Sequence, residues 1–205
     1  MVGRLTALAL IGALAAPVTA LAESGPHGYK GLNPKVAAGE IVGVETDHPE
    51  TDVDWGDASG IVEAPIDQVM AIVTDYAKYA QFMPHFKKSK VLSQRGKKAL
   101  IYVEAKVAKG TLTVWAQMKM RPLKAEGGRM VVEGKMTKGN LSRFEARWEL
   151  LPLSATRTLV RFKLLVDPKV PLPDSLVTWE NVKASRRGIK ALRKQLTAPV
   201  ATVSE

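Results

Sequence analysis

Side chains that can carry acid–base or metal chemistry are few in this chain. Its 205 residues include three histidines and no cysteine, which excludes thiol catalysis and cysteine-ligated metal. His27 and His48 lie in an acidic segment, and His85 directly follows Pro84. The histidines are not spaced as metal ligands, and a flexible acidic segment with one histidine is more often solvated than metal-bound. We therefore predict neither a metal site nor a cofactor.

Catalytic motifs are also missing from the sequence. No Ser–His–Asp order, phosphate-binding loop or dinucleotide fingerprint occurs. The isolated groups left for proton transfer are His85, Tyr102 and Thr158. General acid–base catalysis needs a titratable group that faces the substrate. We predict no catalytic residue, and turnover assisted by these three groups stays open as an alternative.

Five segments between Ala99 and Asp167 alternate apolar with polar or charged residues, the period of two expected of half-buried strands. In the second segment, the uncharged face comprises Leu112, Val114, Ala116, Met118 and Met120. The other segments continue this face with Ile101, Val103, Ala105 and Val107; Met130, Val132, Gly134 and Met136; Phe144, Ala146, Trp148 and Leu150; and Val160, Phe162, Leu164 and Val166. Turn residues between the segments predict a meander of hairpins. A curved sheet with one apolar face is expected.

Helices are predicted on both sides of this meander. A strand over residues 58–64 leads into a helix that begins at Pro65, and a second short helix ends before Pro84. Asp174 is a good cap for a long final helix that reaches about Leu196. Its apolar stripe comprises Leu176, Trp179, Val182, Ile189, Leu192 and Leu196.

The N-terminal residues have the layout of a secretory signal peptide. Arg4 precedes an apolar stretch over residues 5–18, and small residues follow at Ala20 and Ala22. We expect cleavage after Ala22 and a soluble periplasmic protein, because no later stretch approaches the roughly 20 apolar residues of a spanning helix. The expected organisation is a signal peptide (1–22), a loosely structured acidic extension (23–54) with a short strand near 39–44, one domain (55–197) and a flexible tail (198–205).

Charge is distributed unevenly along the chain. Residues 23–57 carry a net charge of −6, whereas residues 58–205 carry +15. These opposite charges suggest that the acidic extension folds back on the basic surface. A basic stripe on the final helix comprises Arg186, Arg187, Lys190, Arg193 and Lys194. It predicts transient contact with an anionic membrane rather than nucleic acid, and the alternative is a solvated helix face.

Three short motifs accompany this order of elements. They are residues 61–69 (IVEAPIDQV), residues 73–84 with VTDYAKY and FMP at their ends, and Leu172-Pro173 before the final helix. Over residues 55–197 the chain resembles the START-like (SRPBCC) superfamily, in particular its polyketide cyclase and coenzyme Q-binding branch. The resemblance implies an α+β helix-grip fold, a curved antiparallel sheet wrapped around a long C-terminal helix, with two short helices after the first strand. It also implies a cavity for lipids, sterols, quinones or polyketides.

The apolar sheet face and the final helix together predict which residues line such a cavity. The expected lining is Val103, Val114, Met118, Met120, Met130, Met136, Phe144, Trp148, Phe162, Val182 and Ile189. The expected mouth is Tyr79, Phe82, Met83 and His85. Apolar concave sites bind mainly by burial, although the methionines are equally suited to filling a core.

We therefore predict a periplasmic binding or carrier protein for a hydrophobic ligand such as a lipid, isoprenoid or quinone. One alternative is a cyclase- or aromatase-like enzyme. The other is a non-catalytic partner-binding module of the cell envelope, which would have a filled interior.

Overall fold

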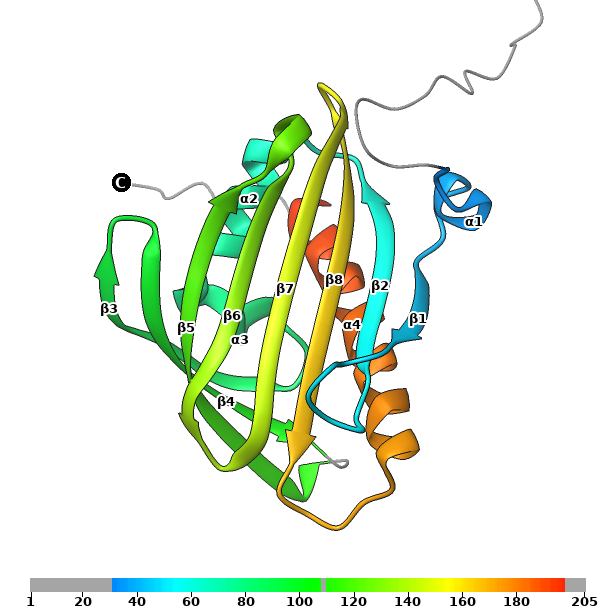
Figure 1. Cartoon of the computed structure of the whole chain (residues 1–205). Coiled ribbons are helices and arrows are strands. Elements are labelled where there is room, and N and C mark those ends of the chain that lie inside the picture. The colour runs from blue at the N-terminus through cyan, green and yellow to red at the C-terminus, as the bar shows by residue number, and fades with distance from the viewer. Residues whose placement is uncertain (1–30, 108–109, 198–205) are drawn as a thin grey trace, which may run out of the picture.

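One curved antiparallel sheet wraps around a long helix in the computed structural model, which describes residues 31–107 and 110–197 (Figure 1). The strands are β1 (Val42–Thr46), β2 (Trp55–Val62), β3 (Phe86–Arg95), β4 (Lys98–Val107), β5 (Leu112–Lys124), β6 (Met130–Gly139), β7 (Leu141–Ser154) and β8 (Arg157–Pro168). Their order across the sheet is β1-β2-β8-β7-β6-β5-β4-β3. The helices are α1 (Pro34–Ala37), α2 (Ile66–Thr74), α3 (Tyr79–Phe82) and α4 (Asp174–Thr197), and a short 3-10 turn precedes α3. This arrangement confirms the predicted α+β helix-grip fold.

Some expectations concern residues outside the described ranges. The proposed signal peptide and the C-terminal tail both lie there. In the part of the chain that is described, no helix is both long and apolar enough to cross a membrane.

The period-two pattern predicted the two faces of the sheet correctly. Inner-face residues such as Ile101, Met118 and Trp148 are buried in one core cluster. The outer face carries ion pairs, including Lys88 with Glu104 (3.1 Å) and Arg143 with Glu145 (3.0 Å). Such partly exposed pairs contribute about 0–1 kcal/mol each. Burial of the apolar face, rather than these pairs, therefore drives the sheet to curve around a core.

The described part of the acidic extension contains the expected strand, at a shifted position, and a short helix, α1, that the sequence did not predict. Its strand is β1, later than the expected 39–44, because Gly39 has a φ of 93° that a strand does not allow. β1 pairs with β2 from Val42↔Ser59 to Thr46↔Trp55. Beyond it, Glu50 bonds to Arg143 of β7 at 2.7 Å. Strand pairing and this ion pair hold the extension on the sheet, in line with the opposite charges.

Helix α4 approaches β2 very closely because the inner face of β2 carries small residues. These are Gly56, Ala58 and Gly60, which alternate along the strand. A Cβ atom added at Gly56 would overlap the backbone of Asn181 in α4. The buried Asn181 amide accepts a hydrogen bond from the Val166 N–H (3.2 Å) and donates to the Val166 carbonyl (3.3 Å). The helix is thus fixed against β2 and β8, near the β1 edge of the sheet.

We predict that Gly56→Ala lowers the free energy of unfolding by about 3 kcal/mol, because backbone on both sides prevents the overlap from relaxing. Ser59→Ala, on the outer side of the same strand, should change it by no more than about 0.5 kcal/mol. Urea unfolding followed by circular dichroism measures both values. Equal unfolding midpoints for Gly56→Ala and the wild type would contradict the close approach of α4.

Candidate functional site: an apolar cavity beside the final helix

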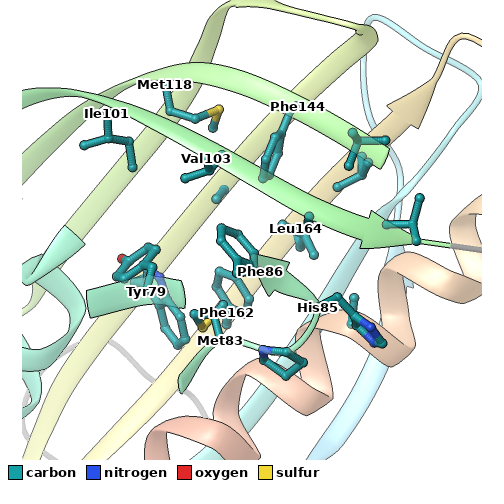
Figure 2. Close-up of a pocket in the computed structure, with 18 of the residues that line it drawn as sticks. Tyr79, Met83, His85, Phe86, Ile101, Val103, Met118, Phe144, Phe162 and Leu164 are labelled. Atoms are coloured by element: carbon teal, nitrogen blue, oxygen red, sulfur yellow. The ribbon is translucent and has the colours of Figure 1, made fainter. Parts of the chain in front are cut away.

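A cavity of about 120 Å³ lies between the inner sheet face and the α3–β3 segment (Figure 2). Strands β4, β5, β7 and β8 supply most of its wall, and α4 contributes one residue. The lining comprises Tyr79, Met83, Pro84, His85, Phe86, Ile101, Val103, Ala105, Val107, Val114, Met118, Met120, Phe144, Ala146, Trp148, Phe162, Leu164, Val166 and Ala184. Nearly all of these side chains are apolar, so the cavity favours an apolar group over water.

The deep wall of the cavity is rigid where aromatic rings stack. Trp148 of β7 and Phe162 of β8 are directly paired in the sheet, and their ring centroids lie 3.8 Å apart at 13°. Stacked aromatic pairs contribute about 0.5–1.5 kcal/mol beyond area burial. Another part of the wall is softer, because it is made by the flexible thioethers of Met118 and Met120.

The α3–β3 segment covers the cavity and is anchored by Tyr79. The Tyr79 hydroxyl donates a hydrogen bond to the Val73 carbonyl at 2.6 Å. Burial raises the pKa of this hydroxyl far above its usual value, so it stays protonated. The Tyr79 ring meets Phe82 and Phe86 edge-on, with centroids 5.6 and 6.2 Å away. Figure 2 shows Phe86 among the side chains that fill the centre of the site.

His85 occupies an unusual backbone position at the edge of the cavity. It has a φ of 68°, the one positive φ of a non-glycine residue among those described. Pro84 precedes it, and the Phe86 N–H donates to the Met83 carbonyl at 3.3 Å. This pattern matches a type II turn, whose third position usually holds glycine. Among the described lining residues only His85 is exposed, so the cavity reaches the surface at this turn.

Seven predicted lining residues do face the cavity, as do three of the four predicted mouth residues. The seven are Val103, Val114, Met118, Met120, Phe144, Trp148 and Phe162, and the three are Tyr79, Met83 and His85. Phe82 is half-buried and does not line the cavity. Its ring instead supports Tyr79 from the side.

Four predicted lining residues lie elsewhere. Met130 and Met136 belong to β6, and the side chains of Met118 and Met120 cover that strand at Gly134. Val182 and Ile189 belong to the side of α4 that packs on β1 and β2. A Cβ atom added at Gly43 would lie 3.1 Å from Val182, and one at Gly60 would lie 3.2 Å from Ile189. The alternation identified the correct face of the sheet. It did not predict that the methionine side chains of β5 would lie over Gly134 of β6.

Several lining residues were not singled out from the sequence. Ile101, Ala105, Val107, Ala146, Leu164 and Val166 share the predicted inner face, so the same alternation was a sufficient signal for them. Phe86 and Ala184 had no such signal. They line the cavity because the α3–β3 turn and the position of α4 bring them there.

Of the three candidate proton-transfer groups, only His85 lines the cavity. The Tyr102 hydroxyl donates to Glu104 (3.1 Å), and its ring stacks on Trp115. Both partners belong to the outer face. The buried Thr158 hydroxyl donates to the Ala64 carbonyl at 2.8 Å. Tyr102 and Thr158 are therefore placed away from any ligand in the cavity. Among the residues described, no cluster of three or more metal-ligating side chains occurs.

The basic stripe of α4 divides into two parts. Arg186, Arg187 and Lys190 line a surface hollow of about 220 Å³ together with Lys183 and Ile41. Lys194 is exposed one turn further on. Arg193 instead turns toward the sheet, where its Nε–H donates to the Ile61 carbonyl at 2.9 Å, and burial lowers its pKa.

A group of exposed apolar residues lies at the β8–α4 connection. It comprises Val170, Leu172, Leu176 and Trp179, each between 39% and 54% exposed. The Lys183 ammonium lies 3.6 Å from the centre of the Trp179 ring. This connection follows Val166 of the cavity wall and is the loop at the lower end of the sheet in Figure 1.

Comparison with known proteins identifies both a family and a fold. Residues 62–193 match the family described as polyketide cyclase / dehydrase and lipid transport. No curated protein sequence matches the chain. A STAR-related lipid transfer protein from Xanthomonas axonopodis has a similar structure, with a TM-score of 0.68 at 18% identity, covering 77% of this chain and 94% of its own.

Two further solved structures share the fold. Human StAR-related lipid transfer protein 5 aligns with a TM-score of 0.64 at 13% identity, over 75% of this chain and 80% of its own. The Zhui aromatase/cyclase from Streptomyces sp. R1128 aligns with a TM-score of 0.55 at 16% identity, over 76% of this chain and 93% of its own. At these identities the similarity is one of fold.

The turn at His85 generates a stability prediction. His85→Gly should keep the free energy of unfolding within about 1 kcal/mol of the wild type, because glycine adopts positive φ without a steric penalty. His85→Val should lose about 2 kcal/mol, since a β-branched residue is strained there. Urea unfolding of the two variants checks this. If His85→Val were as stable as His85→Gly, the positive φ assigned to His85 would be wrong.

Proposed function

Because the chain belongs to the polyketide cyclase / dehydrase and lipid transport family, we propose that it binds a hydrophobic ligand in the cavity and carries it between membranes in the periplasm. The observation that supports this most directly is the apolar lining, with a rigid aromatic wall and a soft methionine wall. Burial of an apolar ligand contributes about 25 cal/mol per Å² removed from water. A lipid, isoprenoid or quinone would gain most from such a site.

The size of the cavity bears on how a ligand enters. A volume of about 120 Å³ resembles that of the engineered cavity of about 150 Å³ that takes up benzene. A longer ligand therefore requires the lining to move apart. Met118, Met120 and Phe86 are the side chains suited to this movement, because they line the cavity without the stacking that fixes Trp148 and Phe162.

Transfer between membranes also needs a surface that touches them. The exposed apolar residues of the β8–α4 connection, including Leu172 and Trp179, are suited to the interface of a bilayer. The cations of α4, such as Arg186 and Lys190, would add about 1 kcal/mol each near an anionic leaflet. A carrier docked in this way would present the Val166 end of its cavity wall toward the lipid.

The proposal predicts a bound ligand. Native mass spectrometry of the mature protein, purified from its own periplasm without detergent, should show a mass shift that solvent extraction removes and identifies. Ala146→Phe should reduce ligand occupancy at least about tenfold, because a ring placed on the cavity wall occupies the space.

The matched control for this measurement is Thr113→Phe, which places the same ring at an exposed position of β5. It should keep full occupancy. If the folded wild type carries no extractable ligand and takes up none from membrane lipid extracts, the binding role is wrong.

Export is predicted separately from binding. Cell fractionation should place the protein in the periplasm, and N-terminal sequencing of the mature form should begin at Glu23. If the protein is found in the cytoplasm and retains residues 1–22, the periplasmic carrier role is wrong. The proposed binding of a ligand in the cavity is not affected by that result.

A further inference from the structure

The exposed edge of the apolar cavity carries a polar pair. His85 lines the cavity, and its Nε2 lies 3.5 Å from Nη1 of Arg187 in α4. At this distance, beyond the usual 2.7–3.2 Å of an N–H hydrogen bond, the contact is long and weak, and its direction depends on the histidine tautomer. Because a guanidinium has five N–H donors, Arg187 keeps donors for a further partner. Figure 2 shows His85 next to α4, at the edge of the group of apolar side chains.

Arg187 also connects the cavity to the basic hollow. It lines the hollow together with Lys183, Arg186 and Lys190. Lys183 pairs with Glu180 at 2.9 Å, but no carboxylate among the described residues lies within ion-pair distance of Arg186, Arg187 or Lys190. The remaining lining residue, Ile41, is apolar. Positive charge is therefore concentrated and unneutralised beside the point where the cavity opens.

The conformation of His85 is consistent with a role for its side chain. A type II turn favours glycine at the third position, and a residue with a Cβ atom is strained there. Strained backbone of this kind often occurs where a side chain is needed for binding. The turn holds the imidazole between the cavity and Arg187.

We propose that the ligand of the cavity is an amphiphile with an anionic head group, a carboxylate or a phosphate, which Arg187 and His85 bind at the cavity edge. The proposal rests on the proposed binding function and adds the chemistry of the head. A guanidinium offers paired N–H donors that fit both anions, and an imidazole offers an N–H as well. The apolar tail would then enter toward Trp148 and Phe162.

Three probes with the same alkyl chain test this head-group preference: dodecanoic acid, dodecyl phosphate and dodecanol. We expect each anionic probe to bind the wild type at least about tenfold more tightly than dodecanol, as measured by isothermal titration calorimetry at fixed ionic strength. Arg187→Gln should remove this preference and leave the dodecanol affinity within about twofold. His85→Gly, which keeps the turn, should reduce the preference about threefold.

Arg95→Gln is the matched control, because it removes an exposed arginine at the end of β3. It should leave all three affinities unchanged. If Arg187→Gln retains the full anion preference, or if wild type binds dodecanol as tightly as the anions, the head-group assignment is overturned while the binding function stands.

Two other outcomes also count against the assignment. Inorganic phosphate that binds as tightly as dodecyl phosphate would make the hollow a site for a free anion rather than for the head of an amphiphile. If the folded wild type binds none of the three probes, the proposed binding function fails as well.

Discussion

Helix α4 has a single position against β2 and β8, near the β1 edge of the sheet, and the cavity and the charged surfaces both follow from it. Gly56 allows the helix backbone to approach the strand, and the buried Asn181 side chain bonds to the backbone N–H and carbonyl of Val166. Thr178 of the same helix accepts a hydrogen bond from the Asp54 N–H at 3.0 Å. Because buried polar groups are costly when unpaired, these bonds define one position for the helix along the sheet.

This position creates the cavity. A helix held at one edge cannot cover the inner faces of β4, β5 and β7, so their apolar side chains meet the α3–β3 segment instead. Tyr79 anchors that segment, and Ala184 is the residue by which α4 closes the remaining side. A second contact, Phe162 against Gly188, would become too close if a Cβ atom were added, at 2.7 Å. The small residues of α4 thus bring the helix to the aromatic wall without filling the space beside it.

The position of α4 also determines where charged side chains find partners. The sheet's outer face pairs its carboxylates with arginine and lysine, and the acidic extension adds Glu50, whose pKa is lowered by its bond to Arg143. Arg186, Arg187 and Lys190 of α4 have no carboxylate partner within ion-pair distance in the described ranges, although their neighbour Lys183 pairs with Glu180. Exposed Trp179, the cations of the hollow and His85 therefore follow one another along α4, because Lys183 contacts Trp179 and Arg187 contacts His85. This arrangement connects the cavity with the proposed membrane contact and the proposed head-group site.

Local sequence was enough to predict which residues face inward, because strand alternation follows directly from backbone geometry. It also predicted the order of the elements and contained the family-like motifs around Pro65 and Pro84. Which inward residues line a cavity and which fill the core depends on tertiary packing. Met118 and Met130 have the same pattern, yet only Met118 reaches the cavity, whereas Met130 packs against the core cluster. The pairing of His85 with Arg187, 102 residues apart, was likewise set by where α4 docks, which depends on packing between distant segments rather than on local sequence.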